Sequence, residues 1–384
     1  GSNGNAAGAA VNVADRDIDF SARIDNATIQ AGSITTASEA DSLGVDVAAG
    51  IAAGSQSFGG AASVTWQTQN NDILAQVSDS TITTDKLAVT ADSSAKEVNV
   101  AGSVAYGGKA GIGAAVAYNK LSNQIQAYLA GSSVTNLTET GVDLDVTAAN
   151  TSKLYAIGAT VAASKSAGLS GTAAINHGGS DTEAVIGEAE DADGKTVTKE
   201  KTTLTNIADT NVEATSSDTR LAVVGNVDIA GKVALGGAVA YNDVGGAGTG
   251  EAGQKTRAAM VNAALTTTDA GKASLHAADT SKLTTIGVGV GGAGKVAIQG
   301  GAATALVNKD ITAEVKNSTI QAAEGGTTSD VSVTADSKST INTVAVAGAG
   351  SGTFAGGAGV SVNRIKQATT AAITGGSQIT DTDT

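Results

Sequence analysis

One long segment recurs along the whole chain, and this repeat constrains the fold more than any other feature of the sequence. In each copy a polar stretch of the type Thr-Ala-Asp-Ser leads into an apolar run, and the six runs open at Leu43, Val98, Leu154, Leu221, Leu283 and Ile341. A partial unit precedes them at positions 1–42. Such a repeat is typical of an array in which each unit buries a face of its neighbour. We therefore predict one continuous array over residues 1–384, without a separate globular domain.

The pattern inside each unit predicts strands. Apolar and polar or small residues alternate, as in residues 98–106 and 111–119, and β-branched residues at period two indicate half-buried strands. Gly, Asn, Asp and Ser separate the alternating stretches and are typical of turns. The expected fold is all-β, a repetitive β-solenoid with units of about 55–67 residues. The alternative is an array of small β-sandwich domains, which the shortage of large aromatic residues disfavours.

Recurring pairs of apolar residues indicate where the chain turns a corner. The members of each pair keep the same separation, with polar residues between them: Ile24 and Ile29, Val77 and Ile82, and Val315 and Ile320. A three-sided coil needs about 20 residues, so each repeat is expected to hold roughly three coils. With a strand spacing of ~4.8 Å, the chain would then form roughly 19 coils and a rod on the order of 90 Å long.

Composition restricts both the core and the kinds of site. Aromatic residues make up 2% of the chain, so Ala, Val, Ile, Leu and Gly must fill the interior. There is no proline, which fits a chain made mostly of paired strands. The absence of cysteine excludes disulfides and thiolate metal sites. The net charge of −14 argues against nucleic acid and anionic lipid as partners.

An asparagine recurs after the second alternating strand of most units. Stacked asparagines form hydrogen-bonded ladders, and asparagine also tolerates a repeated left-handed corner. We therefore expect a structural role for Asn119, Asn176, Asn242, Asn308 and Asn363. Trp66 stands at the nearest matching place in the second unit.

Three aspartates are the candidate metal ligands. Asp15, Asp17 and Asp19 alternate, so they share one face of a predicted strand, and clustered carboxylates are the ligands that calcium prefers. The alternative is a solvated outer face, with Ile18 and Phe20 turned inward. Calcium is thus the one cofactor that the sequence leaves open.

No residues with a catalytic pattern stand out. His177 and His276 fall at different places in their repeats, and neither has a partner at the spacing of a metal site or a catalytic triad. The Gly-rich runs at 245–248 and 287–292 lack the Gly-Lys-Ser/Thr of a phosphate-binding loop. The sequence therefore predicts no catalytic and no cofactor-binding residues, and a protein that is not an enzyme.

The end of each unit resembles a known family. The motifs are Ala-Ala-Thr-Ala-Leu-Val-Asn at 302–308, followed by 313–320, and Gly-Val-Ser-Val-Asn at 359–363, followed by 371–373. They resemble the repeats of leukotoxin-type filamentous adhesins, relatives of filamentous haemagglutinin that are secreted by the two-partner route, over nearly the whole chain. The resemblance implies a right-handed parallel β-helix on the surface of a Gram-negative-type bacterium, exported through an outer-membrane pore. No catalytic residues come with the family shaft, and the family's N-terminal secretion domain is not evident.

Three functional hypotheses follow. The first is a non-enzymatic shaft of a secreted bacterial surface adhesin that mediates or presents adhesion, with a glycan or protein of a host or bacterial surface as partner. The second is a self-assembling extracellular filament or matrix protein that associates end to end. The third is a carbohydrate-active enzyme on a β-helix. Partner binding is expected at the insertions 188–203 and 244–257, which account for the two longest steps between apolar runs, from Leu154 to Leu221 and from Leu221 to Leu283.

Overall fold

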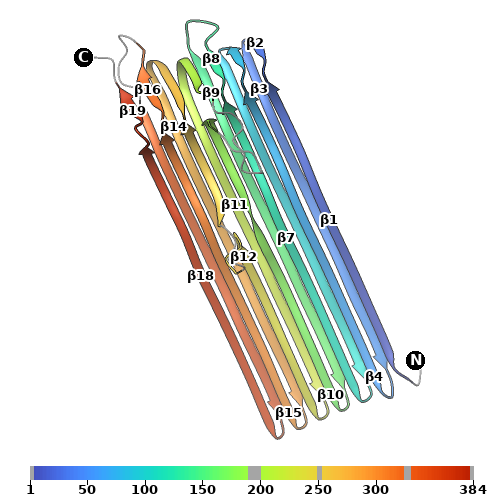
Figure 1. The fold of residues 1–384 in the computed structure, drawn as a ribbon. Helices are drawn as coiled ribbons and strands as arrows, with labels where there is room; N and C mark the ends of the chain where they lie inside the picture. The colour runs from blue at the N-terminus through green and yellow to red at the C-terminus, as the bar shows by residue number, and fades with distance from the viewer. Residues whose placement is uncertain (1–3, 189–199, 249–252, 324–329, 381–384) are drawn as a thin grey trace.

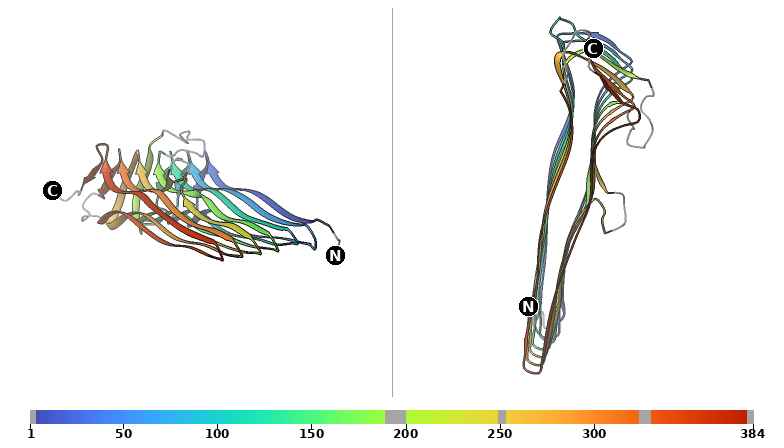
Figure 2. Two further views of the ribbon diagram at one scale, coloured as in Figure 1. Left: turned by 90° about the horizontal axis from the view of Figure 1, so that it is seen from below. Right: turned by 90° about the vertical axis from the view of Figure 1, so that its left-hand side faces the viewer.

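Two layers of long parallel strands lie face to face, joined by tight turns at one end and by short strands at the other (Figures 1 and 2). This computed structural model describes residues 4–188, 200–248, 253–323 and 330–380. The chain runs along a strand of one layer, crosses through a short strand, returns along the second layer and turns back. It is a right-handed β-solenoid, which confirms the expected fold class.

Sheet A is the layer whose strands run away from the tight turns. Its strands pair in parallel with their counterparts in the adjacent coils. One of them is divided, because β12 and β13 both pair with β10 and β15. The strands are β1 (Ala6–Asp25), β4 (Phe58–Ser78), β7 (Ala110–Ala130), β10 (Ala167–Gly187), β12 (Val233–Val244), β13 (Gln254–Val261), β15 (Val296–Lys316) and β18 (Phe354–Thr374).

Sheet B is the layer whose strands return to the tight turns, together with the short strands that bridge the layers. The long strands are β3 (Ser33–Gly54), β6 (Lys86–Gly107), β9 (Val142–Ser164), β11 (Thr202–Ala230), β14 (Ala263–Ala293) and β17 (Asp330–Ser351). The short strands are β2 (Thr28–Gln30), β5 (Thr81–Thr83), β8 (Ser133–Thr135), β16 (Thr319–Ala322) and β19 (Gln378–Thr380). We call the end with the short strands the cap and the end with the tight turns the tip.

Each repeat forms one coil, so the expectation of three coils per repeat is wrong. Residues 33–54 of β3 pair one by one with residues 86–107 of β6, so each residue lies beside its counterpart in the next copy of the repeat. The strands of about 21 residues are roughly 70 Å long, whereas the stack of seven sheet A strands measures roughly 30 Å. The molecule is therefore a blade, longest along its strands, and the expected rod of stacked short coils is also wrong. The same continuous pairing rules out separate sandwich domains in the described part of the chain.

The first residue of the apolar run points inward in only three of the six units. Leu154, Leu283 and Ile341 share one inward column of the stack, but Gly44, Glu97 and Arg220 are their partners in the other coils. Leu43, Val98 and Leu221 lie one residue away, and neighbouring strand residues point to opposite faces. These three apolar side chains therefore point outward.

The interior changes character along the strands. In the cap half the inward side chains form the main apolar core, which contains Val77, Leu129, Ile186 and Val315 among others, all fully buried. In the tip half the inward residues are mostly Ala, Gly, Ser, Thr and Asn. The two sheets come so close there that a Cβ on Gly50 would lie 2.3 Å from the carbonyl oxygen of Ala62. Large side chains have no room between the sheets in the tip half.

The cap corners follow the apolar pairs of the sequence. Asn26, Asp79 and Asn317 adopt left-handed backbone angles between the members of the three pairs, and Gly131 takes the corresponding corner in the third coil. Asparagine, aspartate and glycine tolerate this conformation better than other residues. The predicted polar corner is confirmed. No helix in the described residues is long and apolar enough to cross a membrane.

Candidate functional site

A buried ionic network lies inside the solenoid where the tip half meets the cap half. Arg220 is fully buried, and its Nη2 donates to the carbonyl oxygen of Gly178 at 2.9 Å and lies 3.4 Å from Oδ1 of Asp218. Its Nη1 donates to the carbonyl oxygen of Asp243. A buried guanidinium is tolerated when carboxylate and carbonyl groups surround it, as here.

The network continues into the next coils through Asp279. Lys309 pairs with Asp279, and both side chains are buried. Gln254 joins the two carboxylates, because its Nε2 lies 2.8 Å from Oδ2 of Asp218 and 2.8 Å from Oδ2 of Asp279. Burial raises the pKa of Asp279, and the nearby Lys309 opposes that rise.

A histidine and a tyrosine flank this network on the outer face of sheet A. Nδ1 of His177 lies 3.1 Å from Oδ2 of Asp243, and the Tyr241 hydroxyl donates to the same oxygen at 3.1 Å. Burial alone would raise the pKa of Asp243, but hydrogen bonds from His177, from the Gly248 amide and from Tyr241 hold it below its usual value. Burial and the Asp243 carboxylate raise the pKa of Tyr241. The cluster holds Asp243 as a carboxylate.

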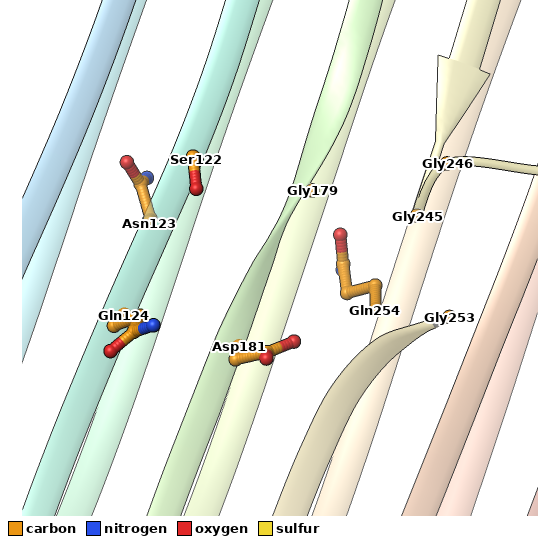
Figure 3. Close-up of a pocket in the computed structure, with 9 residues that line it drawn as sticks. All are labelled: Ser122, Asn123, Gln124, Gly179, Asp181, Gly245, Gly246, Gly253 and Gln254. Atoms are coloured by element: carbon orange, nitrogen blue, oxygen red, sulfur yellow. The ribbon is translucent and has the colours of Figure 1, made fainter. Parts of the chain in front are cut away.

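A cavity of about 250 Å³ opens beside this cluster, where sheet A is interrupted (Figure 3). Pairing of β10 with β12 ends at Asn176 and pairing with β13 begins at Thr182, so the described residues 245–248 and 253 lie outside the ladder. Ser122, Asn123, Gln124, Gly179, Asp181, Gly245, Gly246, Gly253 and Gln254 line the cavity. The cavity is a consequence of the insertion that the long step from Leu221 to Leu283 indicates.

Two side chains of the cavity lining, Asp181 and Gln254, are engaged within the protein, whereas Oδ1 of Asn123 and Oε1 of Gln124 have no hydrogen-bond partner among the described residues. Oδ1 of Asp181 accepts a hydrogen bond from the Lys255 amide at 2.8 Å, and burial raises the pKa of Asp181 despite this bond. Oε1 of Gln254 accepts from the Ser180 amide at 3.0 Å, while its Nε2 is engaged by the ionic network. These groups are therefore committed to holding the divided strand in place.

A second polar cluster lies near the first coils. Nη1 of Arg16 lies 3.0 Å from Oε2 of Glu97, whose side chain is buried. Gly44 makes room for this pair, since a Cβ there would lie 2.0 Å from Oε2 of Glu97 and 2.2 Å from Nη1 of Arg16. Burial raises the pKa of Glu97 to about 7, although Arg16 lowers it and Asp46 adds to the rise.

The recurring asparagines form a partial ladder. Nδ2 of Asn119 donates to Oδ1 of Asn176 at 2.8 Å, and Nδ2 of Asn176 donates to Oδ1 of Asn242 at 2.7 Å. Asn363 lies in the same column, but Ala305 occupies it in the intervening coil, so the expected place of Asn308 is wrong. In the second unit the column residue is Gln67, the neighbour of Trp66. The ladder crosses coils inside the tip half, where it gives the buried amide nitrogens of Asn119 and Asn176 an acceptor.

The three candidate calcium ligands lie on the outer face of β1. Asp15, Asp17 and Asp19 are exposed there and pair in register with Thr68, Asn70 and Asp72 of β4. Across the residues that the structure describes, no group of three or more His, Cys, Asp or Glu is arranged to hold a metal ion. Ile18 packs partly buried against the main core, and Phe20 points the same way but is 50% exposed on this edge strand.

The structure brings together charged residues that the sequence keeps far apart. On the outer face of sheet B, His276 lies 3.3 Å from Glu213 and 3.2 Å from Asp336, its neighbours in adjacent coils. His177 and Asp243 likewise come from different repeats. The members of these pairs are far apart in the sequence, but they lie about one repeat apart. The repeat length is therefore the signal in the sequence that could have found them. Within the two insertions, residues 189–199 and 249–252 lie outside the described residues.

Comparisons with known proteins identify no relative of this chain. No protein-family model matches it. Neither the curated proteins nor the solved structures contain a significant match.

Proposed function

We propose that this chain is a non-enzymatic shaft segment of a secreted bacterial surface adhesin. The observation that supports this role best is the residue-by-residue parallel pairing of every repeat with the next. Such an array lengthens by adding coils and has no need of a new core for each added unit. The sequence resemblance to filamentous adhesin repeats points to the same role and to a location outside the cell.

The shaft would act mechanically. Each coil joins its neighbours by a long ladder in each sheet, and the ionic network and asparagine ladder add bonds between coils. A partner, a glycan or a protein of a host or bacterial surface, would be met by the outer faces or by the insertions. Export of the whole protein through an outer-membrane pore belongs to the same proposal.

Adhesion of coated beads to cells tests this function. Beads that carry the chain should bind cells more than beads that carry an unrelated β-solenoid of equal charge. Replacing residues 189–199 and 249–252 by short Gly-Ser linkers should leave the circular dichroism spectrum unchanged and remove the binding. Equal binding by the chain and the unrelated solenoid would overturn the proposal, and binding that survives the replacement would move the contact from the insertions to the stacked faces.

A self-assembling filament is the second candidate, and the ends of the stack favour it. In the described part of the chain, β1 and β3 pair on one side only, as do β17 and β18 at the other end. Their unpaired edges present rows of backbone donors and acceptors that invite another copy. Light scattering should then show a particle mass that rises with concentration, and a constant monomer mass would exclude this assembly.

A further inference from the structure

Among the described residues, the outward strand residues of the tip half are uncharged on both sheets. On sheet B the outward residues of β3 change from Glu39 and Asp41 near the cap to Val45, Val47 and Ile51 near the tip. The same change occurs in every coil. Between the change and the tip turns, five outward columns on each sheet contain no charged residue. Many of these side chains are large and well exposed, among them Val11, Val47, Ile51, Ile229, Val344 and Val360.

The interior between these two outer faces contains polar side chains, although it is buried. Oδ2 of Asp228 accepts hydrogen bonds from Ser170 at 2.7 Å and from Gln299 at 3.0 Å, and burial raises the pKa of this carboxyl. The asparagine ladder lies in the same half. The tip half therefore reverses the usual arrangement of a protein in water, with small and polar groups inside and apolar groups outside.

The aromatic residues gather at the two limits of this uncharged band. Seven of the nine aromatics of the chain lie in the tip half and point outward. Four lie at the limit nearer the cap, which we call the upper limit, and there Trp66 and Tyr118 stack with ring centroids 4.0 Å apart. Three lie beside the tip turns. The upper group is Trp66, Tyr118, Tyr155 and Tyr241, and the lower group is Phe58, Tyr106 and Phe354.

Lysines lie beyond both limits. Four of the six tip turns carry an exposed lysine, and the turns stack in register, since the Lys295 amide donates to the carbonyl oxygen of Lys232 at 3.0 Å. No acidic residue occupies the tip turns. On the cap side of the upper limit, three lysines form a row on the outer face of sheet B. The tip lysines are Lys109, Lys165, Lys232 and Lys295, and the upper row is Lys96, Lys153 and Lys282.

The dimensions of the band fit one kind of partner. From Phe58 to Trp66 the strand rises about 26 Å. The five outward columns of the band correspond to ten residues of each strand, which rise about 33 Å. The hydrocarbon core of a bilayer is about 30 Å thick, aromatic residues concentrate at both of its interfaces, and lysines lie outside it among the headgroups. A band of this height, with aromatics at both limits and lysines beyond them, is the pattern of a surface in contact with lipid.

We propose that the tip half of the blade enters a lipid bilayer, with its apolar outer faces against the acyl chains and the tip lysines at the far headgroups. Hydrocarbon offers no partner to the open backbone edges of β1, β3, β17 and β18, so inserted blades pair edge to edge with further coils of the same kind. This contact goes beyond the shaft role and does not depend on adhesion to cells.

Trp66 is the only tryptophan and reports the contact directly. The full chain is mixed with vesicles of phosphatidylcholine and phosphatidylglycerol (7:3), and binding is followed by flotation and by Trp66 emission. Flotation with the vesicles, a blue shift, and quenching by lipids brominated near the headgroup are expected. Absence of flotation together with an unshifted Trp66 spectrum would overturn the proposal.

Two pairs of substitutions on the same two strands provide the matched control. Val227 of β11 pairs with Val290 of β14 within the band, and Thr215 pairs with Ala278 nearer the cap. Val227→Glu with Val290→Glu should reduce vesicle binding at least about tenfold, because acidic groups enter hydrocarbon poorly. Thr215→Glu with Ala278→Glu should leave binding unchanged, and circular dichroism melts check that both variants fold. Equal loss in both variants, or no loss in either, would contradict the proposal.

Self-association is the competing explanation of an apolar face, and sedimentation without lipid separates the two. If Val227→Glu with Val290→Glu dissolves an oligomer of the free protein while no variant binds vesicles, the face is an interface between copies and the bilayer proposal is overturned. Lys232→Gln with Lys295→Gln should weaken binding to the anionic vesicles and leave the oligomeric state of the free chain unchanged.

Discussion

Arg220 pairs in register with Leu154, so a fully buried guanidinium occupies the same inward column as a leucine of the preceding coil. Leu283 takes this position in the following coil. Two residues before, Asp218 stands where the neighbouring coils have Ser152 and Ser281. One coil thus replaces the Ser-x-Leu of its neighbours by Asp-x-Arg.

This replacement predicts a specific rescue. Arg220→Leu alone leaves the buried Asp218 carboxylate without its cation and should lower the free energy of unfolding by about 3–5 kcal/mol. Adding Asp218→Ser restores the neighbours' pattern and should recover most of the loss. Urea unfolding of both variants measures the difference. A double variant as unstable as the single one would show that Asp218 does not depend on Arg220.

The strand register predicts opposite outcomes at two adjacent residues. Val315 is fully buried in the cap core, whereas Lys316 is exposed. Val315→Asp should destabilise the fold by several kcal/mol because it buries an unpaired charge, and Lys316→Asp should be nearly silent. Thermal melts of the two variants suffice. Equal effects would mean that the register of β15 is wrong.

The close approach of the sheets in the tip half predicts a second contrast. A Cβ on Gly301 would lie 2.4 Å from the carbonyl oxygen of Val346, whereas a Cβ on Gly300 meets its nearest atom at 3.8 Å. Gly301→Ala should therefore cost about 1–3 kcal/mol of unfolding free energy. Gly300→Ala should be neutral or slightly stabilising, because alanine restricts the unfolded chain. Chemical denaturation compares the two, and similar midpoints would argue against the narrow spacing.

Glu97 predicts a pH dependence of stability. Burial raises its pKa from 4.5 to about 7, so between these values the folded chain holds a proton that the unfolded chain has lost. Its contribution is fully present below pH 4.5 and disappears as the pH rises through about 7. The free energy of unfolding should therefore be larger at pH 5 than at pH 8.

Glu97→Gln isolates this contribution, because glutamine keeps the shape of the protonated acid. Asp228 and Asp279, whose pKa values burial also raises, remain in the variant and retain their share. The difference in unfolding free energy between pH 5 and pH 8 should thus shrink in the variant without vanishing. An unchanged difference would show that Glu97 titrates normally in the folded protein.

The sequence predicted the polar corners because their chemistry is local. Asn26, Asp79 and Asn317 turn the chain where a left-handed residue is needed, and the flanking apolar pairs have only one way to point. The interpretation of the apolar runs failed at Leu43, Val98 and Leu221 for a physical reason. It assumed that the first apolar residue of each run points inward, whereas the strand register places their neighbours Gly44, Glu97 and Arg220 in the inward column and turns these three apolar side chains outward.

The sequence by itself determined that this protein is an all-β array of repeats, because units with a long regular period and alternating polarity bury their apolar faces by stacking on one another. Only the tertiary structure decided that each repeat is one coil of two long strands, since that depends on where the chain turns and not on its period. It also decided which groups meet. His177 and Asp243, or Asp218 and Asp279 through Gln254, are brought together by stacking alone. The spacing between the sheets determines which side chains fit in the core.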